Sequence, residues 1–260
     1  MEYGVIKMLE FKDVTFGYSG ESNNIMEHLS FAVNQGEFVS FIGASGCGKS
    51  TIFRLINKLE LPNTGEILLN GNSIVSLENY GAYMPQKDLL LPWRNIAQNV
   101  ALPMEIQKKS KLEIKLAVEK ILEEVGLLDY KNHSPSELSG GMRQRVSFAR
   151  TLLTGNNLLL LDEPFSALDS LTRIDLQEWL LNEWEKRKQT VMFVTHDVEE
   201  ALFLSHKVFI MRDKPVKSLE MYEVPLPHPR SREDMKRPEV VALKEALICK
   251  LRREVPYDEK

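Results

Sequence analysis

The stretch that decides the fold is Gly43-Ala44-Ser45-Gly46-Cys47-Gly48-Lys49-Ser50-Thr51, which fits the pattern G-x-x-x-x-G-K-[ST]. The apolar run Phe38 to Ile42 precedes it and reads as a buried parallel strand, and a helix is predicted from Lys49 to Leu59. Glycines let the backbone curl so that several N–H groups point at one anion, and the helix N-terminus adds its positive dipole end. A glycine-rich turn before an ordinary helix is the alternative, but the flanking strand and helix favour a phosphate-binding loop.

Two side chains of this loop add chemistry that the backbone cannot supply. Lys49 provides a mobile cation for the β- and γ-phosphates of a nucleotide, and the hydroxyl of Ser50 can ligate Mg²⁺. The loop therefore predicts a bound nucleotide together with a metal ion.

A second segment places two carboxylates directly after a buried strand. Leu158 to Leu161 are consecutive leucines, as in a strand covered on both faces, and Asp162 and Glu163 follow them. Acids in that place need a partner, because an unpaired buried charge is costly. Mg²⁺ fits this need for Asp162, and Glu163 would orient and partly deprotonate an attacking water. A strand that ends at the surface with solvated acids is the alternative, and the phosphate-binding loop argues against it.

A third motif makes the chain resemble the ATP-binding-cassette (ABC) transporter ATPases. Leu138-Ser139-Gly140-Gly141-Met142-Arg143-Gln144-Arg145 is similar to the signature sequence of that family, about twenty residues before the acidic pair. Ser139, Gly140 and Gly141 open a helix predicted to continue to Leu153, so that its N-terminus is a second phosphate-binding helix end. A plain serine cap on an ordinary helix is the alternative.

Further positions match the family one by one. Tyr18, at the end of the first predicted strand, resembles the aromatic side chain that stacks on adenine, although a core tyrosine is the alternative. Gln86 resembles the glutamine that reaches Mg²⁺ and the attacking water. Asp169 resembles a residue of the loop that touches the partner subunit, and it can also be the N-cap of the next helix. His196 resembles the histidine that contacts the γ-phosphate, and it follows a parallel strand, where ligands gather in such sheets.

The resemblance implies ATP and Mg²⁺ as cofactors and a second copy of the chain as partner. In this family the signature helix of one subunit closes over the ATP held by the other, so that two chains about a two-fold axis make two equivalent sites. We therefore expect a dimer that closes on ATP and opens after hydrolysis.

The order of predicted elements indicates an α/β fold. We expect a P-loop NTPase core with a mixed, largely parallel sheet, an N-terminal antiparallel β subdomain and an inserted α-helical subdomain. The expected divisions are residues 1–87 for the β subdomain and the first part of the core, 88–154 for the helical subdomain, 155–212 for the second part of the core, and 213–260 for an extended tail or strand followed by a helix. The predicted strands are 9–18, 29–33, 38–42, 65–71, 158–161, 190–194 and 207–211, and the predicted helices are 49–59, 110–125, 140–153, 171–186, 198–205 and one from Pro238.

Composition narrows the class of protein. The 260 residues are 43% hydrophobic and 27% charged with a net charge of −4, which favours a globular chain and disfavours a broad basic footprint for nucleic acid. No apolar run approaches the roughly 20 residues that cross a bilayer, and no secretion signal is visible. Cys47 and Cys249 cannot form a disulfide framework. We expect a soluble, cytosolic protein.

Segments outside these motifs indicate which group of the family the chain resembles. A single cassette without a membrane segment disfavours fused exporters, and Asp88 to Val100 resembles the nitrate/sulfonate/taurine importer ATPases. Leu91-Pro92-Trp93 would line a groove for a helix of a membrane permease, although core packing of Trp93 is the alternative. The proline-spaced tail and final helix are also similar, whereas Met211 to Pro215 departs from the turn usual in that group.

The resemblance thus implies the ATPase subunit of an importer for a nitrate-, sulfonate- or taurine-like anion or a vitamin precursor. It would lie at the cytoplasmic face of the membrane with an integral membrane permease, and act with an extracytoplasmic substrate-binding protein only indirectly. No nucleic acid is expected as partner. A soluble cassette ATPase acting on nucleic acid or a protein complex is the alternative, and a small-molecule P-loop kinase would leave the signature and His196 without a task. The transported solute is not readable from this chain.

Overall fold

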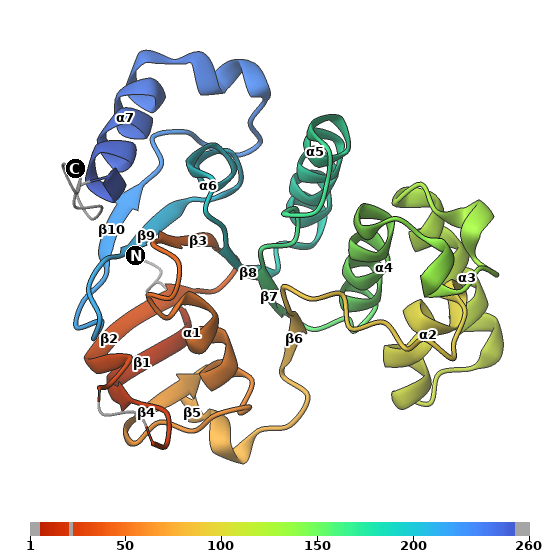
Figure 1. Ribbon diagram of the computed structural model, residues 1–260, viewed down its shortest axis with the longest axis horizontal. Coiled ribbons are helices and arrows are strands. Elements are labelled where there is room, and N and C mark those ends of the chain that lie inside the picture. Colours follow the sequence, from red (N-terminus) through yellow and green to blue (C-terminus); the bar gives the residue numbers. More distant parts are fainter. Residues whose placement is uncertain (1–5, 21–22, 253–260) are drawn as a thin grey trace, which may run out of the picture. The chain divides into compact units, whose positions relative to one another are not determined.

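The structure is a computed structural model that describes residues 6–20 and 23–252 (Figure 1). The strands are β1 (Lys7–Phe16), β2 (Met26–Asn34), β3 (Phe38–Gly43), β4 (Thr64–Leu69), β5 (Asn72–Ser73), β6 (Gly81–Met84), β7 (Leu158–Asp162), β8 (Thr190–Val194), β9 (Lys207–Met211) and β10 (Glu220–Glu223). The helices are α1 (Lys49–Ile56), α2 (Ile96–Ile106), α3 (Lys111–Glu124), α4 (Gly140–Leu152), α5 (Ser170–Arg187), α6 (Val198–Leu204) and α7 (Pro238–Arg252). The chain divides into two units: the first extends up to Glu78 and resumes at Trp184, and the second runs from Asn79 to Glu183.

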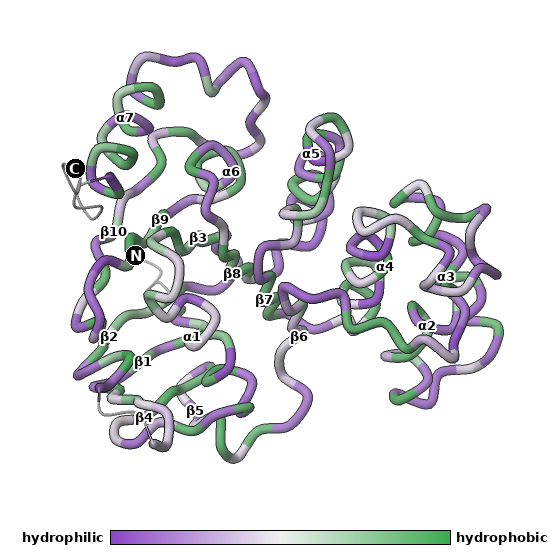
Figure 2. Tube along the Cα trace, in the orientation of Figure 1, coloured by the Kyte–Doolittle hydropathy of each residue, from purple (hydrophilic) through white to green (hydrophobic). Residues whose placement is uncertain are grey.

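The first unit combines an antiparallel sheet with a mainly parallel one. The antiparallel sheet has the order β2-β1-β4-β5. In the other sheet β3 pairs in parallel with β8 and β9, and β10 adds an antiparallel edge to β9. Every residue of β8 is buried, and the trace through β3 is hydrophobic in Figure 2, as expected for strands covered on both faces.

Aromatic rings join the two sheets of this unit. The ring of Phe31 on β2 stacks on Phe11 of β1 at 4.5 Å between centroids and meets Phe41 of β3 edge to face at 5.7 Å. Phe41 in turn stacks on Phe209 of β9 at 5.1 Å. This contact chain fixes β3, and therefore the loop that follows it, against the antiparallel sheet.

The second unit contains a parallel strand pair and the helices α2, α3 and α4. β6 and β7 pair in register from Gly81 opposite Leu158 to Met84 opposite Leu161, so their carboxyl ends meet at one edge. The capping box predicted at the start of α3 is confirmed: the hydroxyl of Ser110 accepts from the N–H of Glu113, whose carboxylate accepts from the N–H of Ser110.

The predicted elements are largely confirmed, with differences at their ends. The first helix ends at Ile56 rather than Leu59, because the side chain of Asn57 donates to the carbonyl of Phe53 and Lys58 has a positive φ. β6 and β10 are only four residues long, too short to be recognised from their sequence pattern, and both form through pairing with a neighbouring strand. Within the described part of the chain, no helix is both long and apolar enough to span a membrane.

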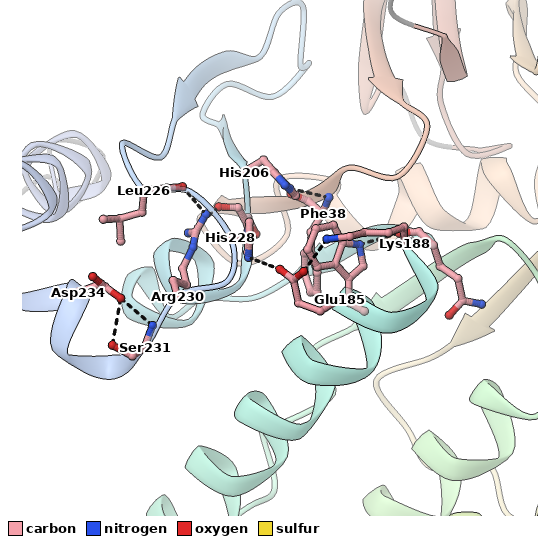
Figure 3. A network of polar contacts seen from close by, with 12 residues as sticks. Phe38, Glu185, Lys188, His206, Leu226, His228, Arg230, Ser231 and Asp234 are labelled. Atoms are coloured by element: carbon pink, nitrogen blue, oxygen red, sulfur yellow. Dashed lines mark hydrogen bonds and ion pairs between the residues drawn. The ribbon is translucent and has the colours of Figure 1, made fainter.

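Histidine and arginine side chains anchor the C-terminal tail in the first unit (Figure 3). The ring of His228 lies 4.4 Å from that of His206 and 4.8 Å from that of Trp184, at the end of α5. Arg230, which is buried, donates to the carbonyls of Leu202, Ser205 and Leu226. These contacts hold the tail against α5 and α6 before it continues into α7.

The buried imidazole of His228 makes the stability of this unit depend on pH. Its side chain is 4% exposed, and its Nδ1 lies 3.5 Å from Oε1 of Glu185, but neither ring nitrogen makes a hydrogen bond among the described residues. Burial nevertheless lowers its pKa from 6.5 to about 3. The nearby cations of Arg230 and Lys188 act in the same direction. The folded chain therefore holds His228 neutral, so the stability that this group contributes is complete above about pH 6.5 and is lost as the pH falls toward 3.

We expect the melting temperature to fall between pH 6.5 and pH 4, with His228 contributing at most about 1.4 kcal/mol per pH unit. A His228→Phe variant keeps an aromatic ring and cannot take up a proton, so its melting temperature should fall less over the same range. Thermal unfolding of both chains, followed by circular dichroism, checks this. Identical pH profiles would contradict the assignment to His228.

Candidate functional site

The loop between β3 and α1 has the backbone that phosphate binding requires. Gly48, the N-cap of α1, has a φ of +107°, and a Cβ atom there would lie 2.7 Å from Cγ2 of Ile25. A Cβ atom on Gly43 would lie 2.2 Å from the carbonyl oxygen of Met211. Larger residues are excluded at both positions, because the backbone is left-handed at one and closely approached at both. Ala44, Ser45 and Gly46 are exposed, so the loop presents its backbone to a ligand.

Lys49 lies across this loop. Its Nζ donates to the carbonyl oxygens of Gly43 and Ala44, each at 2.8 Å, and lies 3.8 Å from Sγ of the buried Cys47. The residue is only 8% exposed. An ammonium group on the loop itself is within reach of any anion that the loop N–H groups bind. Next to it along α1, the side chain of Ser50 is exposed.

Tyr18 and His196 belong to the same unit as this loop. Tyr18 lies just past the end of β1, and its hydroxyl is 3.3 Å from Oγ1 of Thr51, so it borders α1 rather than filling the core. His196 is exposed directly after β8. Since the N–H of Thr195 donates to the carbonyl of Phe41 on β3, His196 leaves the sheet at the edge where the phosphate-binding loop begins.

The acidic pair lies at the end of β7 in the second unit. Asp162 is 2% exposed, and the hydroxyl of Tyr83 donates to its Oδ2 at 3.4 Å. Nε2 of Gln86 donates to Oε2 of Glu163 at 2.9 Å. Glu163 has a φ of +49°, a backbone conformation that residues other than glycine rarely adopt. The structure therefore brings Gln86, Asp162 and Glu163 together where β6 and β7 end.

The signature segment forms the helix end that the sequence predicts. Ser139 is the N-cap of α4, with its hydroxyl accepting from the N–H of Met142 at 3.2 Å, and both Ser139 and Gly140 are exposed. A Cβ atom on Gly141 would lie 3.2 Å from the carbonyl oxygen of Ala167, so the start of α4 contacts the turn after β7.

Asp169 caps the helix that follows this turn. Its carboxylate accepts from the N–H of Thr172 at 3.0 Å, and hydrogen bonds with Thr172 lower the pKa of Asp169. The capping role considered in the sequence analysis is thus confirmed, and the carboxylate is exposed.

A sequence profile decides the family to which these motifs belong. The profile of the family described as "ABC transporter" matches residues 26–166, more than half of the chain.

The chain belongs to the ABC transporter family.

Individual relatives and a solved structure of this family agree with the profile. This ABC ATPase is 46% identical to the formylaminopyrimidine import ATP-binding protein of Halalkalibacterium halodurans over 221 residues, which cover 85% of this chain and 86% of that protein. It is 43% identical to the aliphatic sulfonates import ATP-binding protein of Bacillus cereus over 208 residues, 80% and 82% of the two chains. A dimeric ATP-binding cassette in a post-hydrolysis state, bound to ADP and Pi, matches with a TM-score of 0.77 and 28% identity over 85% of this chain and 100% of that one. The predicted α/β fold and ATP hydrolysis are confirmed.

The structure adds residues that the sequence analysis of this ABC ATPase did not single out. The hydroxyl of Thr195 donates to the buried carboxylate of Glu200 at 2.6 Å and accepts from the N–H of Asp197 at 3.0 Å. Asp197 is the N-cap of α6, so the turn that carries His196 is held on both sides. The Asp197 cap could have been predicted, since Glu199 and Glu200 follow it in the first helical turn; the buried Thr195–Glu200 contact could not.

Proposed function

We propose that this ABC ATPase is the nucleotide-hydrolysing subunit of an importer and couples closure of a dimer on ATP to the transport of a small solute through a separate permease. One observation carries the proposal. The amide of Gln86 donates to the carboxylate of Glu163 beside the buried Asp162, which sets a base and a metal ligand at one strand edge. The import names of both relatives support the choice of an importer.

The side chains have distinct roles in this proposal. The N–H groups of residues 43–51 and the ammonium of Lys49 bind the β- and γ-phosphates, and Tyr18 stacks on the adenine. Glu163 orients the attacking water and accepts its proton, with its carboxylate held in place by Gln86. His196, exposed at the end of β8, contacts the γ-phosphate.

The donor atoms suit Mg²⁺ bound together with a nucleotide. Ser50 offers a hydroxyl, Asp162 a carboxylate and Gln86 the carbonyl oxygen of its amide. Among residues 6–20 and 23–252, no group of three or more acidic, histidine or cysteine side chains is placed so that it could hold a metal ion by itself. Mg²⁺ is typically held by one or two carboxylates with substrate phosphates rather than by an all-protein cage. When bound, the ion neutralises charge that develops on the phosphate oxygens.

In this proposal each ATP site is completed by the start of α4 from a second copy of the chain. Ser139, Gly140 and Gly141 at the start of α4 would close over the ATP held by the partner, and Asp169 would touch the partner near the same seam. The dimeric state of the similar cassette supports this arrangement. Because the nucleotide is then part of the interface, ATP should stabilise the dimer and hydrolysis should weaken it.

The partner in the membrane would be a permease on whose cytoplasmic face the dimer binds. An extracytoplasmic binding protein would deliver the solute to that permease without touching this chain. The two relatives are named for the import of a formylaminopyrimidine and of aliphatic sulfonates, which supports a small organic solute.

The segment after Gln86 has the properties of a docking surface for the permease. The side chain of Trp93 is 76% exposed, so the core-packing alternative is wrong. The loop that carries it is rigid nonetheless, because the buried amide of Asn99 donates to the carbonyls of Leu91 and Arg94 and accepts from the N–H of Leu91. An exposed indole on a loop whose main chain is held in place suits a helix-in-groove contact.

Replacing Trp93 with alanine should weaken binding to the permease at least about tenfold, the effect of a typical aromatic anchor. The melting temperature of the isolated subunit should stay the same, since little of this side chain is buried. Affinity for the detergent-solubilised permease, measured by titration, checks this. The matched control is Leu112→Ala, which removes another exposed apolar side chain, on α3. Trp179→Ala would not serve, because the ring of Trp179 packs on that of Phe148.

Purification from the membrane fraction of its own cells tests the importer proposal against the alternative. We expect this chain to co-purify with a multi-spanning permease whose transport activity requires ATP. ATPase activity that is stimulated by DNA or RNA, without an associated permease, would support the soluble alternative instead.

A further inference from the structure

We propose that Gln144 is a positioning residue that couples the two ATP sites of the dimer, an inference that rests on the proposed function. Gln144 lies on α4, five residues after Ser139, and is 4% exposed. Its Nε2 donates to the carbonyl of Glu163 at 3.0 Å and to Oγ of Ser166 at 3.3 Å, and its Oε1 accepts from the N–H of Ala167 at 2.9 Å. Both ends of the amide therefore bind the turn that follows β7.

The turn that Gln144 holds is the one that carries the catalytic carboxylate. Glu163 has a φ of +49°, and such a conformation persists only where the surroundings stabilise it. Its carbonyl also accepts from the N–H and the hydroxyl of Ser166, inside the same turn. Gln144 adds a donor from a different element, α4, and thereby fixes the position of the turn relative to that helix.

The same helix carries the residues proposed to bind the partner's nucleotide. Ser139 and Gly140 are exposed at its start, and a Cβ atom on Gly141 would lie 3.2 Å from the carbonyl oxygen of Ala167, so close that the turn would have to shift slightly. A displacement of α4 on binding the partner's ATP is thus transmitted to Ala167 and, through Gln144, to the main chain of Glu163. Since Glu163 acts on the ATP of its own chain, one site senses the occupancy of the other.

A merely structural role for Gln144 makes a different prediction. Any buried amide needs hydrogen-bond partners, and losing them destabilises the fold without a specific effect on turnover. A coupling role predicts in addition that kcat and cooperativity fall while ATP still binds. These two readouts separate the roles.

The experiment measures ATP hydrolysis by the full chain as a function of ATP concentration. Gln144→Met keeps the length of the side chain and removes its hydrogen bonds, and Gln144→Glu keeps an acceptor for Ala167 and removes the donor to Glu163. For both variants we expect kcat to fall about tenfold or more with a KM for ATP within about twofold, since small displacements of a catalytic group have effects of this size. The Hill coefficient should be above one for the unmodified chain and close to one for the variants.

Thr151→Val is the matched control on the same helix. Thr151 is 4% exposed, and its hydroxyl donates to the carbonyl of Ser147 within α4, away from the turn. This variant should lose stability and keep its Hill coefficient. If Gln144→Met does not fold, Gln144→Glu still decides the question, because it preserves the shape of the side chain.

The outcomes distinguish this inference from the proposed function. An unmodified chain with no ATP hydrolysis would refute the proposed function, whatever the variants do. An unmodified chain that hydrolyses ATP without cooperativity, or Gln144 variants that retain kcat and the Hill coefficient, would overturn the coupling role alone. A lower kcat with unchanged cooperativity would also overturn it.

Discussion

Replacement of Lys49 by alanine should lower ATP turnover at least about a hundredfold, which corresponds to about 2.7 kcal/mol of lost transition-state stabilisation. The ammonium of Lys49 is held on the carbonyls of Gly43 and Ala44, in the loop that we propose to bind the phosphates. Alanine leaves the backbone N–H groups in place but removes the cation that offsets the charge of the β- and γ-phosphates. Steady-state kinetics of the variant measure the loss of turnover, and nucleotide titration measures the loss of ATP affinity.

The control for Lys49 is Lys58, whose ammonium also binds a backbone carbonyl but which has no proposed role in binding ATP. Lys58, just past α1, also donates its ammonium to a backbone carbonyl, that of Leu77. Lys58→Ala should lose some stability and retain turnover. A Lys49→Ala chain with near-normal ATPase activity would remove Lys49 from the phosphate site.

Replacement of Glu163 by glutamine should leave ATP binding within a few-fold of normal and lower turnover by roughly 10² to 10⁴, the contribution of a general base. Glutamine keeps an oxygen that can accept from Gln86, so the geometry at the ends of β6 and β7 is preserved. It cannot accept a proton from water. Equilibrium binding of ATP and single-turnover hydrolysis measure the two effects separately.

A half-buried glutamate in the same unit, Glu119, serves as the control for Glu163. Glu119 pairs with Lys131 at 2.8 Å on the surface of the helical region, and Glu119→Gln should leave turnover unchanged. If Glu163→Gln hydrolysed ATP at the normal rate, another group would have to be the base.

The parts of the site that are local in sequence were predictable. Residues 43–51 contain the glycines that their own backbone conformation requires, since Gly46 and Gly48 both have positive φ, and the four leucines before Asp162 identify a buried strand. Ser139 is likewise an N-cap defined by its immediate neighbours. In each case the residues that determine the structure are adjacent along the chain.

The parts that depend on pairing between distant segments were not predictable from the residues themselves. Gln86 reaches Glu163 because β6 pairs with β7, and β6 has only four residues, too few to be recognised as a strand from its sequence. Gln144 reads as a surface residue of an ordinary helix, and only the contact of α4 with Ala167 makes it buried. Gln86 entered through the resemblance to the family, whereas the role of Gln144 required the structure.

The exposure of Trp93 illustrates a third case. Its sequence context fits both a core tryptophan and a docking residue, and the choice depends on Asn99, eight residues after Leu91, whose amide holds the loop on α2. The side chain of Trp93 thereby remains exposed although the main chain on either side is fixed.

A mixing experiment tests whether each ATP is shared between two chains. Lys49→Ala disables the phosphate loop, and Ser139→Arg disables the exposed start of α4, so each variant alone should be inactive. If the sites form between chains, a mixed dimer holds one site with an intact loop and an intact signature. Equal amounts form about half mixed dimers, each with one intact site of two, which gives at most about a quarter of the normal activity.

The control mixture combines Lys49→Ala with a chain that carries both substitutions, in which no intact site can form. The account predicts ATPase activity in the first mixture, well above the sum of its components, and none in the control. A first mixture no more active than its separate chains would contradict it, because each ATP would then be bound and hydrolysed within a single chain.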